Sequence, residues 1–149
     1  FADSRDSLND YPPLYFITPN LEEGQELTGE TEPKKIIKEL AKRKDQNVLL
    51  TLGKEGMLLL DQSSSEKKLF HLGVHGKTEV VDVTGAGDTV IATLSMASAS
   101  GLSPLAASIL ATYASGIVVR KSGTARVDFA ELVEAVAEDK RLAVKKLEI

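Results

Sequence analysis

The chain carries no charged side chain from Thr89 to Val119, a span of about 30 residues. A bilayer is crossed by roughly 20 apolar residues, so a membrane helix has to be considered. The span is instead rich in Ser, Thr, Ala and Gly, and the segment from Gly101 to Pro104 combines a helix stop with a helix start. We therefore predict two buried helices joined as a hairpin, and no membrane partner.

Composition and charge narrow the class of protein further. The 149 residues are 42% hydrophobic and 27% charged, as in an ordinary globular domain. There are 22 acidic and 18 basic side chains, and no long run of Lys or Arg, so nucleic acid is not an expected partner. The absence of cysteine excludes disulfides and thiolate metal sites. Because the first residues lack the apolar core of a signal peptide, a cytoplasmic location is expected.

The remaining segments alternate between predicted strands and predicted helices. Apolar runs of strand length occur at 14–18, 48–52, 57–60, 69–74 and 79–83. Helices are expected from the cap Asn20 to about Gly29, from Pro33 to Ala41, and after the capping pattern at Asp128 and Glu131. This alternation predicts an α/β fold with a largely parallel sheet flanked by helices, whose ligand sites lie beyond the carboxyl ends of the strands.

A glycine-rich string, DVTGAGD from Asp82 to Asp88, joins the last of these predicted strands to the hairpin. Its glycines let the backbone curl and direct amides at one spot, where the helix N-terminus adds partial positive charge. Such a nest can stabilise the charge on a transferring phosphoryl group. Asp88, at the helix start, is placed to accept the proton of an attacking alcohol. The alternative is a simple turn in which Asp88 only caps the helix.

Two other phosphate-binding patterns do not fit this spacing. A dinucleotide fingerprint would need glycine where Val90 stands, and a Walker loop would need Lys after its last glycine, where Asp88 stands. A histidine metal site is not expected either, because His71 and His75 lie in a predicted strand or loop without a third ligand. We expect both histidines at solvated or edge positions.

The segment DVTGAGDT at 82–89 closely resembles the carboxyl-terminal signature of PfkB/ribokinase-like carbohydrate kinases, DTxGAGD, and its core departs from it only at Val83. Two further segments resemble the family in the same order: TPNLEE at 18–23 resembles its NxxE motif, and TLGKEG at 51–56 its nucleotide loop. Residues 111–127 are similar to the adenine-side helix and cation loop, most like the heptose 7-phosphate kinase module of ADP-heptose synthases.

The resemblance covers nearly the whole chain but only the later half of the family's usual length. It implies that residues 1–149 form the C-terminal nucleotide-binding and catalytic portion of a single ribokinase-like kinase domain. Phe1 and Ala2 look like the end of a buried strand, so we expect the natural chain to start earlier.

The same resemblance implies a role for each matching residue. Asp88 is the expected catalytic base, with Gly85, Ala86 and Gly87 forming an anion hole through their amides. The other implied contacts are with the nucleotide and with cations: Thr51, Gly53 and Gly56 line the nucleotide, Thr112 and Gly116 face the adenine, Asn20 and Glu23 position Mg²⁺ through water, and Asp82, Thr84, Val119 and Gly123 hold a monovalent cation such as K⁺. Many relatives carry Asn where Thr112 stands.

The predicted function is ATP-dependent phosphorylation of a hydroxyl on a sugar or sugar phosphate by direct in-line transfer. The C1 hydroxyl of D-glycero-D-manno-heptose 7-phosphate is the expected acceptor, on the likeness of 111–127 alone. Three alternatives stay open: a kinase for another acceptor (ribose, a fructose phosphate or a nucleoside), an ATP-binding module that lacks the sugar site, and a non-catalytic relative. An intact Asp88 counts against the last. Because relatives commonly pair through a lid, a homodimer is an open option for the full-length protein.

Overall fold

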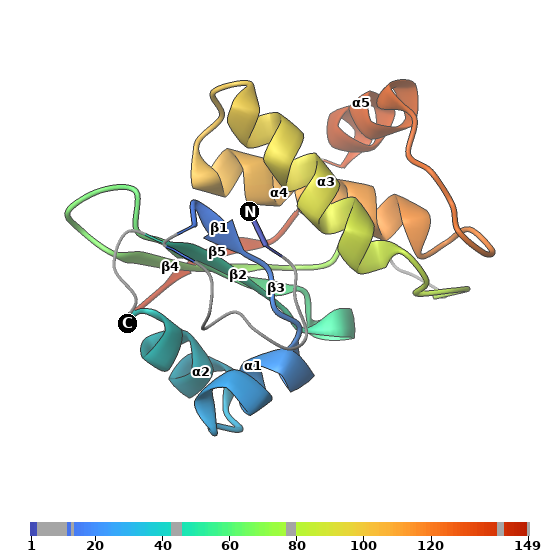
Figure 1. The fold of residues 1–149 in the computed structure, drawn as a ribbon. Helices are drawn as coiled ribbons and strands as arrows, with labels where there is room; N and C mark the ends of the chain where they lie inside the picture. Colours follow the sequence, from blue (N-terminus) through green and yellow to red (C-terminus); the bar gives the residue numbers. More distant parts are fainter. Residues whose placement is uncertain (3–11, 13, 43–45, 77–79, 140–141, 149) are drawn as a thin grey trace. The chain divides into compact units, whose positions relative to one another are not determined.

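The computed structural model describes residues 1–2, 12, 14–42, 46–76, 80–139 and 142–148 (Figure 1). The chain divides into two compact units, one formed by Phe1–Leu72 with Val144–Ile149 and the other by Gly73–Ala143. We call them unit 1 and unit 2 and describe each by itself. Strands and helices belong to unit 1, whereas unit 2 is helical in its described part.

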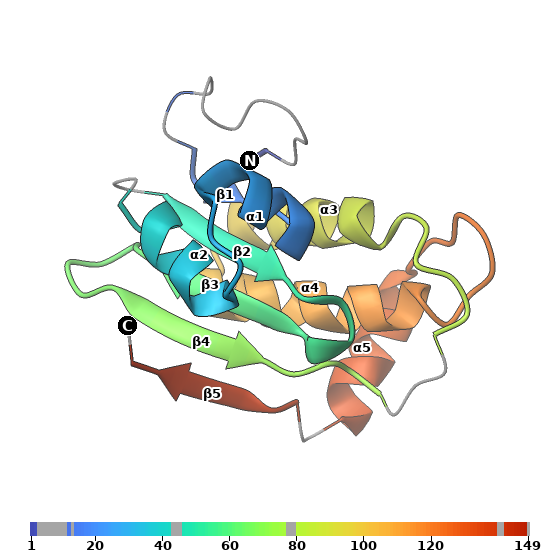
Figure 2. The same cartoon turned by 90° about the horizontal axis from the view of Figure 1, so that it is seen from below.

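Unit 1 is built on a five-stranded sheet in which the strands follow one another in chain order. The strands are β1 (Phe16–Ile17), β2 (Asn47–Thr51), β3 (Met57–Asp61), β4 (Lys68–Leu72) and β5 (Val144–Leu147). Among these strands β1 and β2 pair in parallel, while β2–β3, β3–β4 and β4–β5 are antiparallel (Figure 2). The mixture of strands and helices confirms the α/β class. The prediction of a largely parallel sheet was wrong, because most of the strand pairs are antiparallel. The turns at 52–56 and 62–67 are too short for the crossover that parallel neighbours require.

Two strand assignments differ from those expected. The described residues of 79–83 form no strand, because the N–H groups of Val81 and Asp82 donate to the Val119 carbonyl, at 2.8 and 3.2 Å, instead of to a neighbouring strand. Conversely, β5 was not expected, since its sequence VKKL has too little apolar character to be read as a strand. It pairs with β4 through the register Leu72 to Val144.

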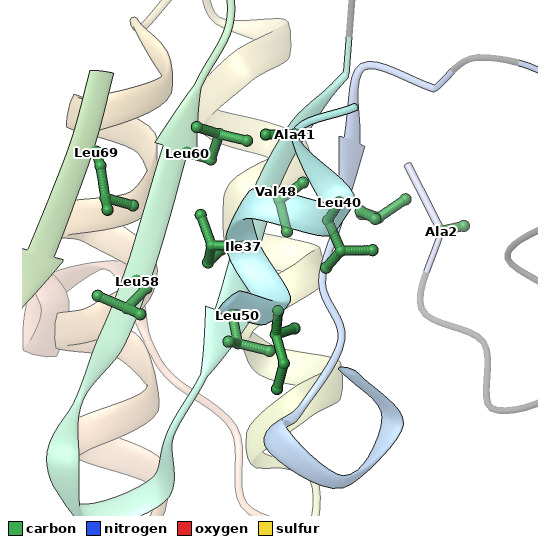
Figure 3. Packing of buried hydrophobic residues seen from close by; sticks show 11 residues of the cluster. Ala2, Ile37, Leu40, Ala41, Val48, Leu50, Leu58, Leu60 and Leu69 are labelled. Carbon is green, nitrogen blue, oxygen red and sulfur yellow. The ribbon is translucent and has the colours of Figure 1, made fainter. Parts of the chain in front are cut away.

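Helices α1 (Leu21–Thr28) and α2 (Pro33–Leu40) lie together on one face of this sheet (Figure 1). Ile36, Ile37 and Leu40 recur at helical spacing and are buried against apolar side chains of β2 and β3. Figure 3 shows this core. Its members from the strands are Ile17, Val48, Leu50, Leu58, Leu60 and Leu69. The expected amphipathic helix from Pro33 is thus confirmed.

Unit 2 contains α3 (Ala86–Ala99), α4 (Pro104–Val118) and α5 (Phe129–Glu138). α3 and α4 pack side by side (Figures 1 and 2). Between them Gly101 adopts a left-handed φ of 85°, and the Ser103 side chain caps α4 by accepting the Ala106 N–H. The predicted hairpin is confirmed, and within the described residues no helix is both long and apolar enough to span a membrane.

Candidate functional site

The glycine string enters α3 through a left-handed turn. Gly85 has φ 78° at the N-cap position, a conformation that residues with a Cβ rarely adopt. The Gly85 carbonyl accepts the Thr89 N–H at 2.9 Å and the Thr89 hydroxyl at 2.8 Å. The Ala86 N–H donates to the Val83 carbonyl at 3.1 Å, so that amide is engaged within the loop.

The first turn of α3 presents free hydrogen-bonding groups. Within the part of the chain that the structure describes, the N–H groups of Gly87 and Asp88 have no acceptor. Asp88 is exposed, and no described residue donates to its carboxylate or pairs with it. The simple capping role is therefore not what Asp88 does here, since Gly85 occupies the cap position. Two amides and one carboxylate at a helix N-terminus can bind an anion and accept a proton beside it.

Asp82 ties this loop to the segment after α4. Its Oδ1 accepts the Thr84 N–H at 2.9 Å, and its Oδ2 accepts the Gly123 N–H at 3.0 Å. These bonds, those from Thr84 first, hold the pKa of the Asp82 carboxyl below its ordinary value. The Val119 carbonyl also belongs to this group, since it accepts the Val81 and Asp82 N–H groups. The four residues expected around a monovalent cation, Asp82, Thr84, Val119 and Gly123, therefore lie together. A cation at that carbonyl would have to compete with two donors already present.

The two residues expected to face adenine have other contacts in α4. Thr112 is buried, and its hydroxyl donates to the Ser108 carbonyl at 2.9 Å. Gly116 turns its bare Cα toward His75, so that a Cβ there would lie 3.0 Å from both the Cβ and the carbonyl oxygen of His75. A side chain larger than glycine at position 116 would therefore crowd His75 within unit 2, and the contact of Gly116 with adenine stays a prediction.

His75 belongs to a polar cluster that the sequence did not reveal. Its Nδ1 lies 2.8 Å from Asp139 Oδ2, its side chain is only 10% exposed, and its ring lies 4.8 Å from that of Tyr113. The Tyr113 hydroxyl donates to the Asp139 carbonyl at 2.8 Å. Burial, followed by the charge of Asp139, raises the pKa of Tyr113. A solvated position for His75 was therefore wrong, because its partners come from α4 and from the end of α5.

In unit 1, Asn20 and Glu23 form a reciprocal cap at the start of α1. The Glu23 N–H donates to Asn20 Oδ1 and the Asn20 N–H donates to Glu23 Oε2, both at 2.9 Å. Glu23 is buried rather than solvated. Among the described residues, no group of three acidic or histidine side chains could enclose a metal ion. Hard oxygen donors of this kind still suit Mg²⁺, which usually takes one or two carboxylates and completes its shell with water and phosphate.

The segment resembling a nucleotide loop lies directly beside this cap. Asn20 and Thr51 form a parallel bridge, and the Thr51 N–H donates to the Pro19 carbonyl at 3.0 Å. The loop itself contains a 3-10 turn, η1 (Gly53–Glu55), in which Gly53 has φ 57° and Gly56 has φ 87°. The predicted residues of unit 1 are thus brought together where β1 and β2 end, the edge at which parallel strands place ligands.

Comparisons with known proteins show which family the chain resembles. The family described as pfkB family carbohydrate kinase matches residues 3–129. The bifunctional protein HldE of Desulfatibacillum aliphaticivorans is 40% identical over an alignment of 134 residues, which covers 85% of this chain and 26% of that protein. The HldE protein of Methylococcus capsulatus is 44% identical over an alignment of 125 residues, which covers 80% of this chain and 26% of that protein. The chain therefore spans about a quarter of the length of the curated relatives it matches.

Solved structures show the same fold. A ribokinase from Thermotoga maritima is similar with a TM-score of 0.68 and 29% identity, over 84% of this chain and 43% of that one. The ribokinase of Arabidopsis thaliana, solved with ribose and ATP, gives a TM-score of 0.71 and 29% identity, over 81% and 40%. The ribokinase-like fold expected from the glycine string is confirmed.

Proposed function

The chain belongs to the pfkB family of carbohydrate kinases, and from this premise we propose that it is the nucleotide-binding and catalytic portion of an ATP-dependent kinase for a sugar or sugar phosphate. The observation that carries the proposal is Asp88, an exposed carboxylate without a described partner, one helical position beyond a free amide at the start of α3. A family member that had lost catalysis would not need to keep both the Asp88 carboxylate and the free amide before it.

Asp88 would act as the general base. As an acceptor hydroxyl attacks the γ-phosphorus of ATP, its proton passes to the Asp88 carboxylate, the new O–P bond forms in line, and the bond to the ADP oxygen breaks. No covalent enzyme intermediate is needed. Because Asp88 has no competing donor among the described residues, its oxygens are available to that hydroxyl.

The backbone of the same turn would stabilise the transferring group. The N–H groups of Gly87 and Asp88 are free in the described structure, and the left-handed Gly85 directs the chain so that they start the helix. Amides at a helix N-terminus favour the charge that spreads over the phosphoryl oxygens. The Ala86 N–H would join them only by leaving the Val83 carbonyl.

Nucleotide and Mg²⁺ would be held by unit 1. Thr51, Gly53 and Gly56 would line the nucleotide, since glycines with positive φ allow its close approach to the backbone. Glu23 and Asn20 would hold the metal ion through water, and the ion, when bound, neutralises charge on the phosphates. A monovalent cation beside Asp82 and Gly123 is a further proposal, which is tested by adding K⁺ to the assay.

The acceptor proposed first is heptose 7-phosphate, at its C1 hydroxyl. This choice is supported by about 40% identity to HldE proteins, which exceeds the 29% identity to ribokinases. The rival is a nucleotide-binding module without turnover, because this chain spans only 26% of the HldE length.

The experiment is a comparison of Asp88→Asn with Asp128→Asn. Both remove one carboxylate at a helix start, but Asp128 is only the cap of α5 and Asn also caps well. This chain and a longer protein containing it are titrated with ATP and Mg²⁺ by calorimetry, and ADP release is followed with a panel of sugar phosphates. We expect Asp88→Asn to lower kcat by about 10²–10⁴-fold with ATP affinity nearly unchanged, and Asp128→Asn to lower neither. ATP binding without turnover in either protein would favour the binding module, and no ATP binding would refute the proposal.

A further inference from the structure

We infer that His71 is a positioning residue of the nucleotide loop: from β4 its ring holds the Glu55 carbonyl and thereby fixes the shape of the turn at 52–56. The ring nitrogen Nε2 lies 2.8 Å from the Glu55 oxygen. A carbonyl oxygen can only accept, so Nε2 carries the proton in this contact. The inference rests on the proposed function, in which this turn lines the nucleotide.

The turn is held by its own backbone only in part. The Leu52 N–H donates to the Gly56 carbonyl at 2.8 Å, the Glu55 N–H to the Leu52 carbonyl at 3.2 Å, and the Gly56 N–H to the Gly53 carbonyl at 3.1 Å. Two of these three bonds exceed 3.0 Å and belong to a single 3-10 turn, whose geometry is intrinsically poorer than that of an α-helix. The His71 contact adds a further bond to this turn, from a strand outside it.

The peptide between Glu55 and Gly56 is the unit that His71 controls. Gly56 has φ 87° and ψ −136°, and glycine reaches many other backbone conformations at little cost. Because the peptide is planar, the direction of the Glu55 carbonyl also sets the direction of the Gly56 N–H. With the carbonyl held by His71, that N–H points at Gly53. If the carbonyl is released, only the bond from the Gly56 N–H to the Gly53 carbonyl, at 3.1 Å, still orients this peptide, and rotation of its plane costs less.

The position of His71 makes this anchor rigid. In the β3–β4 ladder His71 is directly opposite Leu58, so both side chains lie on the same face of the sheet as the core beneath α1 and α2. Its neighbours in the strand, Leu69 and Leu72, are fully buried and fix the strand. The ring therefore reaches the turn from a fixed base, and a loop that is already in its binding shape pays less ordering entropy when a ligand arrives.

The test compares two substitutions that differ in one hydrogen-bond donor. His71→Gln places an amide N–H near the position of Nε2, whereas His71→Leu keeps a similar bulk without a donor. ATP with Mg²⁺ is titrated into the wild-type chain and both variants by calorimetry, urea unfolding is measured in parallel, and the exchange rate of the Gly56 amide is followed by NMR.

We expect His71→Leu to weaken ATP binding about five- to tenfold and to speed Gly56 exchange, and His71→Gln to restore both to within about threefold of wild type. Equal ATP affinity in wild type and His71→Leu would overturn the inference while leaving the proposed function intact. An equal loss of ATP affinity in both variants, together with an equal fall in their urea midpoints, would also overturn the inference. Such a result would mean that His71 has a purely structural role. No ATP binding by the wild-type chain would overturn the proposed function and the inference with it.

Discussion

Replacing Gly116 by Ala tests whether this glycine serves packing rather than adenine binding. The new Cβ would lie 3.0 Å from the Cβ and the carbonyl oxygen of His75 and 3.2 Å from its Cδ2, whereas carbon atoms in favourable contact are about 3.5–4.0 Å apart. His75 cannot withdraw easily, because Asp139 and Tyr113 hold its ring. Overpacking of this kind costs about 1–3 kcal/mol, and the better helix propensity of Ala returns about 1 kcal/mol. We expect a net loss of about 1 kcal/mol.

The assay is thermal and urea unfolding of the Gly116→Ala chain, with ATP titration beside it. A loss of this size lowers Tm by about 2–4 °C in a chain of this length. Ser115→Ala, in the same turn of α4, adds no atom and should stay within about 0.5 kcal/mol of wild type. ATP affinity stays unchanged if Gly116 serves packing alone. Stabilisation by about 1 kcal/mol would refute the packing argument, and weakened ATP binding at unchanged stability would show instead that Gly116 faces the base.

Two further predictions concern unit 2. Tyr113→Phe removes the hydroxyl that donates to the Asp139 carbonyl at the end of α5, and should lower the free energy of unfolding by about 1 kcal/mol, measured by urea unfolding. Unchanged stability would mean that water replaces this bond. The pKa of Asp82 is lowered in the folded chain, so its contribution to stability is complete above the pKa of the unfolded carboxyl, about 4, and is lost as the pH falls through the folded pKa. Asp82→Asn should therefore lower the urea midpoint at pH 7 but much less at pH 2.5, and an equal deficit at both would refute the assignment.

Features that depend on neighbours along the chain could be predicted from the sequence. The cap at Asn20 and Glu23, the break at Gly101 to Pro104 and the cap at Asp128 each involve residues within one helical turn of one another. The left-handed Gly85 follows from the glycine string in the same way, since only glycine enters that conformation freely. Local chemistry was sufficient for the helices and for the place of Asp88 in the first turn of α3.

Features that depend on distant partners required the tertiary structure. Strand direction in unit 1 followed from turns too short to cross over, and β5 exists because β4 offers it an edge, not because VKKL favours a strand. The contacts of His71 with Glu55, of His75 with Asp139 and of Asp82 with Gly123 join residues 16, 64 and 41 positions apart. A side chain that binds a distant partner leaves no periodic pattern in the sequence, because the fold of the backbone, and not the spacing of the two residues, brings them together.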